Sequence, residues 1–419
     1  MRILVIGAGA REHAIVNALL KDKGVSDVFA APGNAGISKF VRSFPLDIRD
    51  ATKTLELAID LKVDLVVIGP EIPLAEGVAD VVRNHGIPVF GPNKDAAQIE
   101  SSKSFAKEVM KSAGVSTACW FDCESREEVE EALSSFSPPY VVKDDSLAQG
   151  KGVIVTESIE EARAHALSCI SHGKVVIEEF LSGEEVSLFL LSDGNQTVPL
   201  QPAQDFKRVF DNDEGPNTGG MGAYSPLPFL SANFGEVVAR EIGDKVIAEL
   251  KKRGMPFIGL LYAGLIITND GVKVIEFNAR FGDPETQVVL SRLLSPLGEV
   301  LIKTARGELQ SLPPLQWSED SVVNVVLASE NYPDTPTTGD EIVGLEAAQL
   351  VDGVEIFHAG TIEKDGQIVS AGGRVLSVTA SGNNLTEARK RAYEAIGRIS
   401  LRGGQYRSDI AKKASENQG

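Results

Sequence analysis

The sequence predicts a multidomain protein that combines α/β and α+β folds. Its 419 residues exceed what one ordinary hydrophobic core encloses. The first ~95 residues alternate short apolar runs with helical patterns, which is typical of a doubly wound parallel sheet. Further along, apolar runs joined by short turn sequences indicate antiparallel strand pairs, as in α+β domains.

Composition and charge exclude several classes of protein. The net charge of −18 argues against broad binding to nucleic acids or anionic membranes, because both need a basic surface. No apolar run approaches the ~20 residues of a membrane-spanning helix, and the N-terminus lacks a signal-peptide layout. Cys119, Cys123 and Cys169 form no disulfide or metal-binding pattern. We expect a cytoplasmic protein with reduced thiols, either a monomer or a weak dimer.

An N-terminal α/β domain is predicted over residues 1–102. Its ligands should bind beyond the carboxyl ends of the parallel strands. The buried strands are expected at residues 3–6, 28–30, 65–68 and 88–90. The helices between them are expected at residues 12–20, 52–61 and 75–84.

A second domain is predicted over residues 103–310, with a lid subdomain at 118–190. It opens with a helix from about Ser102 to Ala113, and capping boxes at 125–128 and 158–161 each begin another helix. A short polar loop between two of its strands has the composition of a flap. Lid strands are expected at residues 140–143, 152–156 and 174–179.

The rest of the chain contains a hairpin and a small C-terminal domain of mixed β/α type. The turn composition at residues 268–271 should pair residues 261–267 with 272–278, and another strand is expected at 186–191. Residues 312–317 are predicted to be a linker. Residues 320–419 form the last domain, with a late helix over 386–396.

The strand at residues 272–278 is the most informative segment. Alternate residues of a strand share a face, so Glu276 and Asn278 should point the same way while Ile275 and Phe277 enter a core. A carboxylate and a carboxamide supply the hard oxygen ligands that suit Mg²⁺ holding phosphates. Arg280 should extend the same face and hold an anion. A solvated polar face is the simpler alternative for this strand alone.

The turn after the first strand, GAGAREH, resembles a dinucleotide-binding turn but departs from it. Glu12 replaces the third glycine, and no acidic residue follows the second strand for a ribose diol. Arg11 and the second turn, APGNAG at residues 31–36, favour a sugar phosphate instead. A tight turn with a solvated arginine is the alternative.

Three further segments carry polar chemistry. The glycine-rich residues 215–226 can wrap an anion with backbone N–H groups. Lys103, Lys143 and Lys151 lie near a helix start, a strand end and the flap, where lysines commonly meet phosphates. Residues 175–187 join an apolar strand to two acidic pairs. Backbone groups around Phe180 and Leu181 can read an adenine edge, and Glu178 or Glu185 can hold ribose hydroxyls or order the metal site, whereas a polar strand end is the simpler alternative.

In order along the chain, GAGAREHA, APGNAG, IGPE, GKGV, IEEFL, GPNTGGMGAYSP, EFNARFGDPETQ, FHAGT and GGRVLSVTA all occur. On this ordered set, nearly the whole chain resembles the phosphoribosylamine–glycine ligases, a family of the ATP-grasp superfamily. The resemblance implies a pre-ATP-grasp domain, an ATP-grasp domain with its flap subdomain, and a C-terminal domain. It also implies the ATP-dependent ligation of glycine to 5-phospho-β-D-ribosylamine through glycyl phosphate, in purine biosynthesis.

The resemblance also implies a role for each matching residue. The expected metal ligands, for Mg²⁺ or Mn²⁺, are Glu276 and Asn278, and the expected catalytic residues are Lys143, Arg280 and Asp283. The expected ATP-binding residues are Lys103, Lys143, Lys151, Glu178, Glu179, Phe180, Leu181 and Glu185. The expected substrate-binding residues are Gly9, Arg11, Asn34, Glu71, Asp205, Gly219, Gly220 and Arg280.

The chain departs from the family pattern at a few positions. The flap carries Asp144, Ser146 and Gln149, which add a negative charge and remove a glycine. Phe206 stands where histidine is usual, and the loop at 171–173 is short. Three alternatives remain open: an ATP-grasp ligase or carboxylase acting on another acid, a nicotinamide oxidoreductase, and a nucleotide-binding protein without catalysis.

Overall fold

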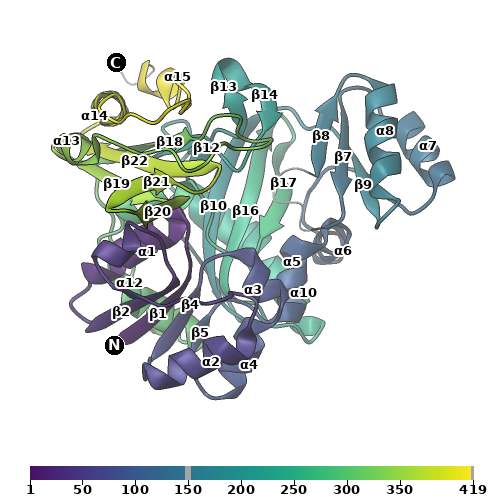
Figure 1. Ribbon diagram of the computed structural model, residues 1–419. Helices are drawn as coiled ribbons and strands as arrows, with labels where there is room; N and C mark the ends of the chain where they lie inside the picture. Colours follow the sequence, from purple (N-terminus) through teal and green to yellow (C-terminus); the bar gives the residue numbers. More distant parts are fainter. Residues whose placement is uncertain (147–151, 417–419) are drawn as a thin grey trace.

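The computed structural model describes residues 1–146 and 152–416 (Figure 1). The N-terminal domain lies at the bottom of this view, a small lid stands out at the upper right, and the C-terminal strands lie at the upper left. A long central sheet connects these three parts. Among the described residues, no helix combines the length and the apolar character needed to cross a membrane.

The N-terminal domain is a five-stranded parallel sheet in the order β3-β2-β1-β4-β5, which confirms the predicted doubly wound fold. Alternate residues of β1 enter two separate cores, Leu4 and Ile6 on one face and Ile3 and Val5 on the other. A strand buried on both faces reads as a continuous apolar run. The strands are β1 (Arg2–Gly7), β2 (Asp27–Pro32), β3 (Arg42–Ser43), β4 (Leu65–Ile68) and β5 (Val89–Phe90). The helices are α1 (Ala10–Leu20), α2 (Ala51–Asp60), α3 (Glu71–Ala75), α4 (Val78–Asn84) and α5 (Lys94–Ser101), with the 3₁₀ turn η1 (Ile37–Lys39).

Helix α6 (Lys103–Ala113) leads from this domain into the next. The Ser102 hydroxyl accepts the N–H of Phe105 at 3.0 Å and caps the first turn. Gly114 ends the helix in the left-handed conformation, at φ +65°, which costs glycine no steric strain. The predicted helix is therefore confirmed at both ends.

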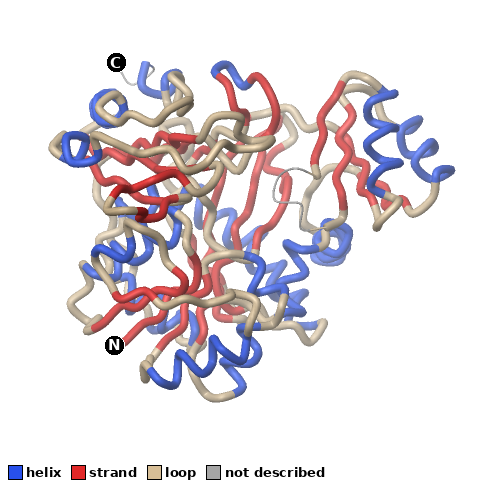
Figure 2. Tube along the Cα trace, in the orientation of Figure 1, coloured by secondary structure: helices blue, strands red, loops and turns tan. Residues whose placement is uncertain are grey.

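The lid is a four-stranded antiparallel sheet in the order β6-β9-β7-β8, with two helices on one side of it (Figure 2). Cys123 and Cys169 are buried in its own core, and all three cysteines are unpaired as expected. Ser125 and Glu128 form the predicted capping box. The second predicted box does not form, because the Glu161 side chain accepts from the Thr156 hydroxyl, and Ser158 alone caps α8. The elements are β6 (Trp120–Cys123), α7 (Arg126–Ser135), β7 (Tyr140–Asp144), β8 (Val153–Thr156), α8 (Ile159–Cys169) and β9 (Val175–Glu179).

The central sheet has the order β11-β10-β16-β17 and is antiparallel. Thr268 pairs with Gly271, so the predicted hairpin turn is confirmed. Because β10 pairs with β16, the segment after residue 183 belongs to this sheet rather than to the lid. Its elements are β10 (Glu184–Asp193), β11 (Thr197–Pro199), α9 (Phe234–Val238), the π-helical turn η3 (Ala239–Gly243), α10 (Asp244–Lys252), β16 (Ile258–Thr268), β17 (Gly271–Asn278), α11 (Glu285–Arg292), α12 (Leu297–Ala305) and η4 (Leu309–Ser311).

The C-terminal sheet takes strands from both sides of the predicted linker. Its antiparallel order is β12-β15-β18-β22-β19, so β12 and β15, from within residues 103–310, pair into it. The sheet's strands are β12 (Gln204–Asp205), β15 (Gly222–Ser225), β18 (Ser321–Ala328), β19 (Val354–His358) and β22 (Arg374–Gly382). The remaining elements are β13 (Arg208–Phe210), η2 (Asp211–Asp213), β14 (Glu214–Asn217), α13 (Leu345–Gln349), β20 (Thr361–Lys364), β21 (Gln367–Ser370), α14 (Leu385–Ile396) and α15 (Lys412–Glu416).

Candidate active site

A cavity of about 1460 Å³ lies where these parts meet. Most of the residues predicted from the sequence line it: Arg11, Glu71, Lys103, Lys143, Glu178, Glu179, Phe180, Leu181, Glu185, Asp205, Gly219, Glu276, Asn278, Arg280 and Asp283. Gly9, Asn34 and Gly220 are not among its lining residues. Lys151 and Gln149 lie outside the described residues.

Strand β17 presents Glu276 and Asn278 to the cavity and buries Phe277 between them. The prediction that Ile275 points into the core is wrong. Gly264 pairs with Glu276 and Leu265 with Val274, so Ile275 is the extra residue of a β-bulge. A bulge interrupts the alternation of side chains along a strand. Ile275 therefore lines the cavity, and its carbonyl accepts from Lys143 Nζ at 3.4 Å.

The charge on Glu276 is stabilised by lysines from several elements. Burial opposes ionisation, but Lys207, Lys143 and Lys103 outweigh it and hold the pKa of Glu276 below its usual value. Lys207, which the sequence analysis missed, also contacts Glu185 at 2.8 Å. The described residues include no group of three or more His, Cys, Asp or Glu placed to hold a metal. A cation on Glu276 and Asn278 would therefore take its remaining ligands from water or from a bound nucleotide.

Glu178 is shared by two lysines, Lys107 and Lys143, and these three residues are called the lysine cluster below. Lys107 Nζ lies 2.5 Å from Glu178 Oε2, and Lys143 Nζ contacts Glu178 Oε1. All three residues are at most 5% exposed. Lys107 was not predicted, although it follows Lys103 by four residues and so lies on the same face of α6.

The foot of the flap is held by several polar contacts. Lys103 Nζ donates to the Ser146 carbonyl at 2.9 Å, and Asp145 accepts the N–H of Ser104 at the same distance. Asp144, a departure from the family pattern, lies 3.0 Å from Nε2 of His172 in the short loop at 171–173. Two of the departures from the family pattern are therefore in direct contact.

The predicted adenine hinge forms another wall of the cavity, after β9. Glu179 accepts the N–H of Cys119 at 3.0 Å, and Lys273 lies 3.5 Å away. Phe180 is 44% exposed and lines the cavity together with Leu181. An exposed ring at a cavity wall can pack against a flat aromatic base.

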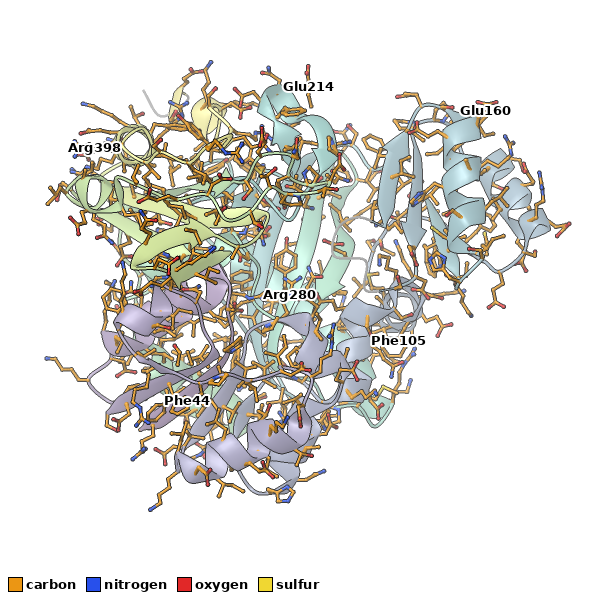
Figure 3. The ribbon with its side chains drawn as sticks, in the orientation of Figure 1. Phe44, Phe105, Glu160, Glu214, Arg280 and Arg398 are labelled. Carbon is orange, nitrogen blue, oxygen red and sulfur yellow. The ribbon has the colours of Figure 1, made fainter. Side chains whose placement is uncertain are left out.

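Arg280 lies beyond the end of β17, near the centre of the molecule, where the N-terminal domain meets the central sheet (Figure 3). Two carboxylates of that domain hold it, Glu100 at 2.8 Å and Glu71 at 3.5 Å. Glu100, which the sequence analysis missed, also accepts the Ala279 N–H at 2.7 Å. Burial opposes the charge of Arg280, but Glu100 and Glu71 outweigh burial and raise its pKa, so Arg280 is a permanent cation facing the cavity.

The glycine-rich loop does not form the predicted anion cradle in this structure. Four successive backbone N–H groups of the loop donate hydrogen bonds within the protein. Thr218 donates to the Lys207 carbonyl, Gly219 to the Tyr332 hydroxyl, Gly220 to the Thr218 hydroxyl and Met221 to the Phe206 carbonyl. The loop instead presents carbonyls to a cation, because Arg374 donates to Gly219 O and to Asp283 O, each at 2.5 Å. Arg374 comes from the GGRV motif and was missed as a site residue.

Asp283 is an ionised carboxylate held from two sides. Gln287 donates to its Oδ1 at 2.8 Å, and Arg374 lies 3.5 Å from its Oδ2. Burial opposes its charge, but Arg374 and Arg11 hold its pKa below the usual value. Asp205 differs, because burial and the neighbouring Glu285 raise its pKa well above the usual value.

The turn after β1 is closed by the protein's own carboxylate. Glu12 accepts the N–H of Gly9 and the Nε of Arg11, both at 2.6 Å, and these three residues are called the turn cluster below. A Cβ at Gly69 would lie 2.0 Å from Glu12 Oε1, so only glycine fits there. Glu12 thus occupies the helix start where a dinucleotide phosphate would bind. This contact argues against the nicotinamide oxidoreductase alternative.

Asn34 joins two domains rather than facing the cavity. Its amide nitrogen donates to Ala8 O and His358 O, and its oxygen accepts the N–H groups of Gly36 and Ile37. All four hydrogen-bonding positions of the side chain are therefore used inside the protein. At the departure Phe206, the guanidinium of the buried Arg407 lies over the ring at 5.0 Å.

Comparison with known families assigns the chain along almost its whole length. Residues 1–100 match the N domain of phosphoribosylglycinamide synthetase, residues 101–286 its ATP-grasp (A) domain, and residues 322–413 its C domain. The chain is 56% identical over 417 residues to phosphoribosylamine–glycine ligase of Streptomyces coelicolor, covering 99% of this chain and 100% of that one. It is 52% identical over 423 residues to the Mycobacterium tuberculosis ligase, covering 99% of each.

Solved structures agree with this assignment. The crystal structure of phosphoribosylamine–glycine ligase from Thermotoga maritima matches with a TM-score of 0.84 at 36% identity, over 98% of this chain and 100% of that one. The biotin carboxylase domain of a Hydrogenobacter thermophilus 2-oxoglutarate carboxylase matches with a TM-score of 0.71 at 16% identity, over 97% and 91%, and so shares the fold alone. By its domains, its full-length relatives and its fold, the chain belongs to the phosphoribosylglycinamide synthetase family, the phosphoribosylamine–glycine ligases.

Proposed function

We propose that this protein ligates glycine to 5-phospho-β-D-ribosylamine, converting ATP to ADP and phosphate and releasing glycinamide ribonucleotide. The observation that carries the proposal is that one cavity gathers the lysine cluster, Glu276, Asn278 and Arg280 in a chain of this family. Phosphoryl transfer requires alignment and charge neutralisation more than proton chemistry. A cavity with several fixed cations supports that requirement.

The order of the reaction follows from leaving-group chemistry. A carboxylate does not accept an amine directly, because an oxide would have to leave. Transfer of the γ-phosphoryl group to glycine gives glycyl phosphate, from which phosphate can leave when the ribosylamine nitrogen attacks. Lys103, Lys143 and Arg280 face the cavity and can hold phosphoryl oxygens during both steps.

Glu276 and Asn278 are the residues that would hold Mg²⁺ or Mn²⁺ against the nucleotide. Their hard oxygens, together with the lowered pKa of Glu276, fit such an ion. The ion would neutralise part of the phosphate charge. Asp283 faces the same cavity with a lowered pKa, which suits it to hold a cationic amine rather than to accept a proton.

The test is mass detection of glycinamide ribonucleotide after mixing the protein with ATP, Mg²⁺, glycine and fresh phosphoribosylamine. Product should form only with all four reagents, and Glu276→Ala should lower turnover by about 10³-fold or more with an unchanged circular dichroism spectrum. Glu214→Ala is the matched control, because Glu214 is exposed and lies outside the cavity lining. ADP release that does not depend on glycine would contradict the proposed substrate. Full activity of Glu276→Ala would contradict the metal site.

A further inference from the structure

We propose that Lys107 is a positioning residue that keeps Lys143 available for the nucleotide. By sharing Glu178 with Lys143, Lys107 leaves the lysine cluster with one positive charge for phosphate oxygens. This inference rests on the proposed function, because it takes a nucleoside triphosphate as the ligand of Lys143.

The geometry places Glu178 between the two lysines. Each carboxylate oxygen has its own ammonium group: Oε2 lies 2.5 Å from Lys107 Nζ, and Oε1 contacts Lys143 Nζ. The three residues come from different elements, α6, β7 and β9, and are at most 5% exposed. Water therefore screens their mutual attraction little.

Lys107 lines the same cavity but is held by several partners besides Glu178. Its Nζ donates to the Thr117 hydroxyl at 2.8 Å, and that hydroxyl donates to the Val274 carbonyl of β17 at 2.7 Å. The ring of Trp120 lies 5.6 Å from the same nitrogen. With Glu178, these neighbours surround the ammonium of Lys107 and hold it in the wall.

Among the residues that the structure describes, Lys143 has fewer fixed partners. Besides Glu178, its Nζ donates to the Ile275 carbonyl at 3.4 Å, at the bulge beside Glu276. A phosphate oxygen can replace that long contact. Lys107 already pairs with one oxygen of Glu178. The carboxylate therefore attracts Lys143 less strongly, and Lys143 is easier for a phosphate to recruit.

The charge count gives the consequence of removing Lys107. Lys107, Lys143 and Glu178 together carry one net positive charge at neutral pH. Without Lys107, Lys143 and Glu178 form a neutral buried pair, and the attraction for a triphosphate falls. Without Glu178, Lys143 has no carboxylate to compete for, so Lys107 no longer decides whether Lys143 reaches a phosphate oxygen.

The experiment is a double-mutant cycle read by calorimetric titration with MgATP, without glycine or phosphoribosylamine. Lys107→Met in the otherwise unchanged protein should weaken binding by about tenfold or more. In the Glu178→Gln background, the same substitution should change the dissociation constant by no more than about twofold. Lys111→Met is the matched control, because Lys111 lies one turn further along α6 and is exposed.

Each outcome bears on the inference. An equal loss of affinity in both backgrounds would overturn it, because Lys107 would then act on the nucleotide through its own charge and not through Glu178. An unchanged affinity of Lys107→Met would overturn it too. If Lys107→Met fails to fold, the comparison of Glu178→Gln with the double variant remains, because the double variant loses the carboxylate together with one of its two lysines. A tenfold loss of affinity between those two variants would overturn the inference. Failure of the unsubstituted protein to bind MgATP would instead refute the proposed nucleotide site.

Discussion

The turn cluster and the lysine cluster are built from the same parts but differ in charge balance. In the turn cluster, one carboxylate, Glu12, binds one cation, Arg11, and the N–H of Gly9. In the lysine cluster, one carboxylate, Glu178, is shared by Lys107 and Lys143. The turn cluster has no net charge, and the Glu12 side chain occupies the N–H group that an anion would otherwise bind. The lysine cluster retains a positive charge beside a cavity.

The comparison teaches that a glycine-rich turn does not by itself make a phosphate site. The turn after β1 has the glycines and the helix N-terminus that attract anions, yet Glu12 occupies that position. The phosphate site is better predicted where cations outnumber carboxylates within one buried group. Three substitutions test this contrast.

The largest effect is expected at Lys143, the member of the lysine cluster proposed to meet phosphate. Lys143→Met should weaken MgATP binding by about 10²-fold or more, because a desolvated charge contact is lost. The fold should persist, since Glu178 keeps Lys107 as a partner. Calorimetric titration measures the affinity, with Lys111→Met as the control. A dissociation constant within twofold of the unsubstituted protein would show that the two clusters do not differ as described.

A smaller effect, on stability rather than affinity, is expected in the turn cluster. Glu12→Gln removes the charge that neutralises the buried Arg11 and should cost about 3 kcal/mol of the free energy of unfolding. The midpoint of urea unfolding should fall, while MgATP affinity should stay within about twofold. Glu56→Gln, at an exposed position of α2, is the control. A large loss of MgATP affinity with normal stability would place the nucleotide at this turn instead.

The smallest effect concerns the histidines next to the turn cluster. Burial is the main cause that lowers the pKa of His13 to about 3 and of His358 to about 4. In the unfolded chain both protonate near pH 6.5, so the unfolded state binds more protons below that pH. Stability should therefore fall by about 0.7 kcal/mol per histidine between pH 7 and pH 6, and more steeply down to pH 4.

The measurement is the urea midpoint as a function of pH. His13→Asn keeps an acceptor for the His358 N–H, which lies 2.9 Å from His13 Nδ1, but does not titrate. That variant should remove about half of the pH dependence that the two histidines cause. An unchanged pH profile would mean that His13 titrates alike in the folded and unfolded chain, which would contradict its lowered pKa.

Much of the fold could be predicted because local signals agree with the tertiary structure. Several predicted features depend only on neighbouring residues. They are the apolar runs of β1 and β4, the cap at Ser102 and the end at Gly114 of α6, and the hairpin turn at 268–271. Glu276 and Asn278 were placed on one face because a strand alternates with period two. The same rule wrongly predicted that Ile275 points into the core, because a bulge depends on how the partner strand β16 pairs.

Site residues from distant segments were harder to predict. The residues that were missed act through partners far away in the sequence. Lys107 pairs with Glu178, 71 positions away, Glu100 with Arg280, 180 positions away, and Arg374 with Asp283, 91 positions away. Only Lys107 had a local signal, its helical spacing from Lys103. The glycine loop also had a clear signal, but the packing of Tyr332 and Arg374 against it occupies the groups that were expected to bind an anion.

By itself, the sequence determined the strands, helices, caps and turns, and the residue types that suit phosphate, metal and amine. It could do so because hydrophobic periodicity and capping depend on residues a few positions apart. Only the tertiary structure decided which charged groups neutralise each other. Glu12 lies beside Arg11 in the chain, whereas Glu178 meets Lys107 and Lys143 only after α6, β7 and β9 have packed together, and burial then makes each pairing strong.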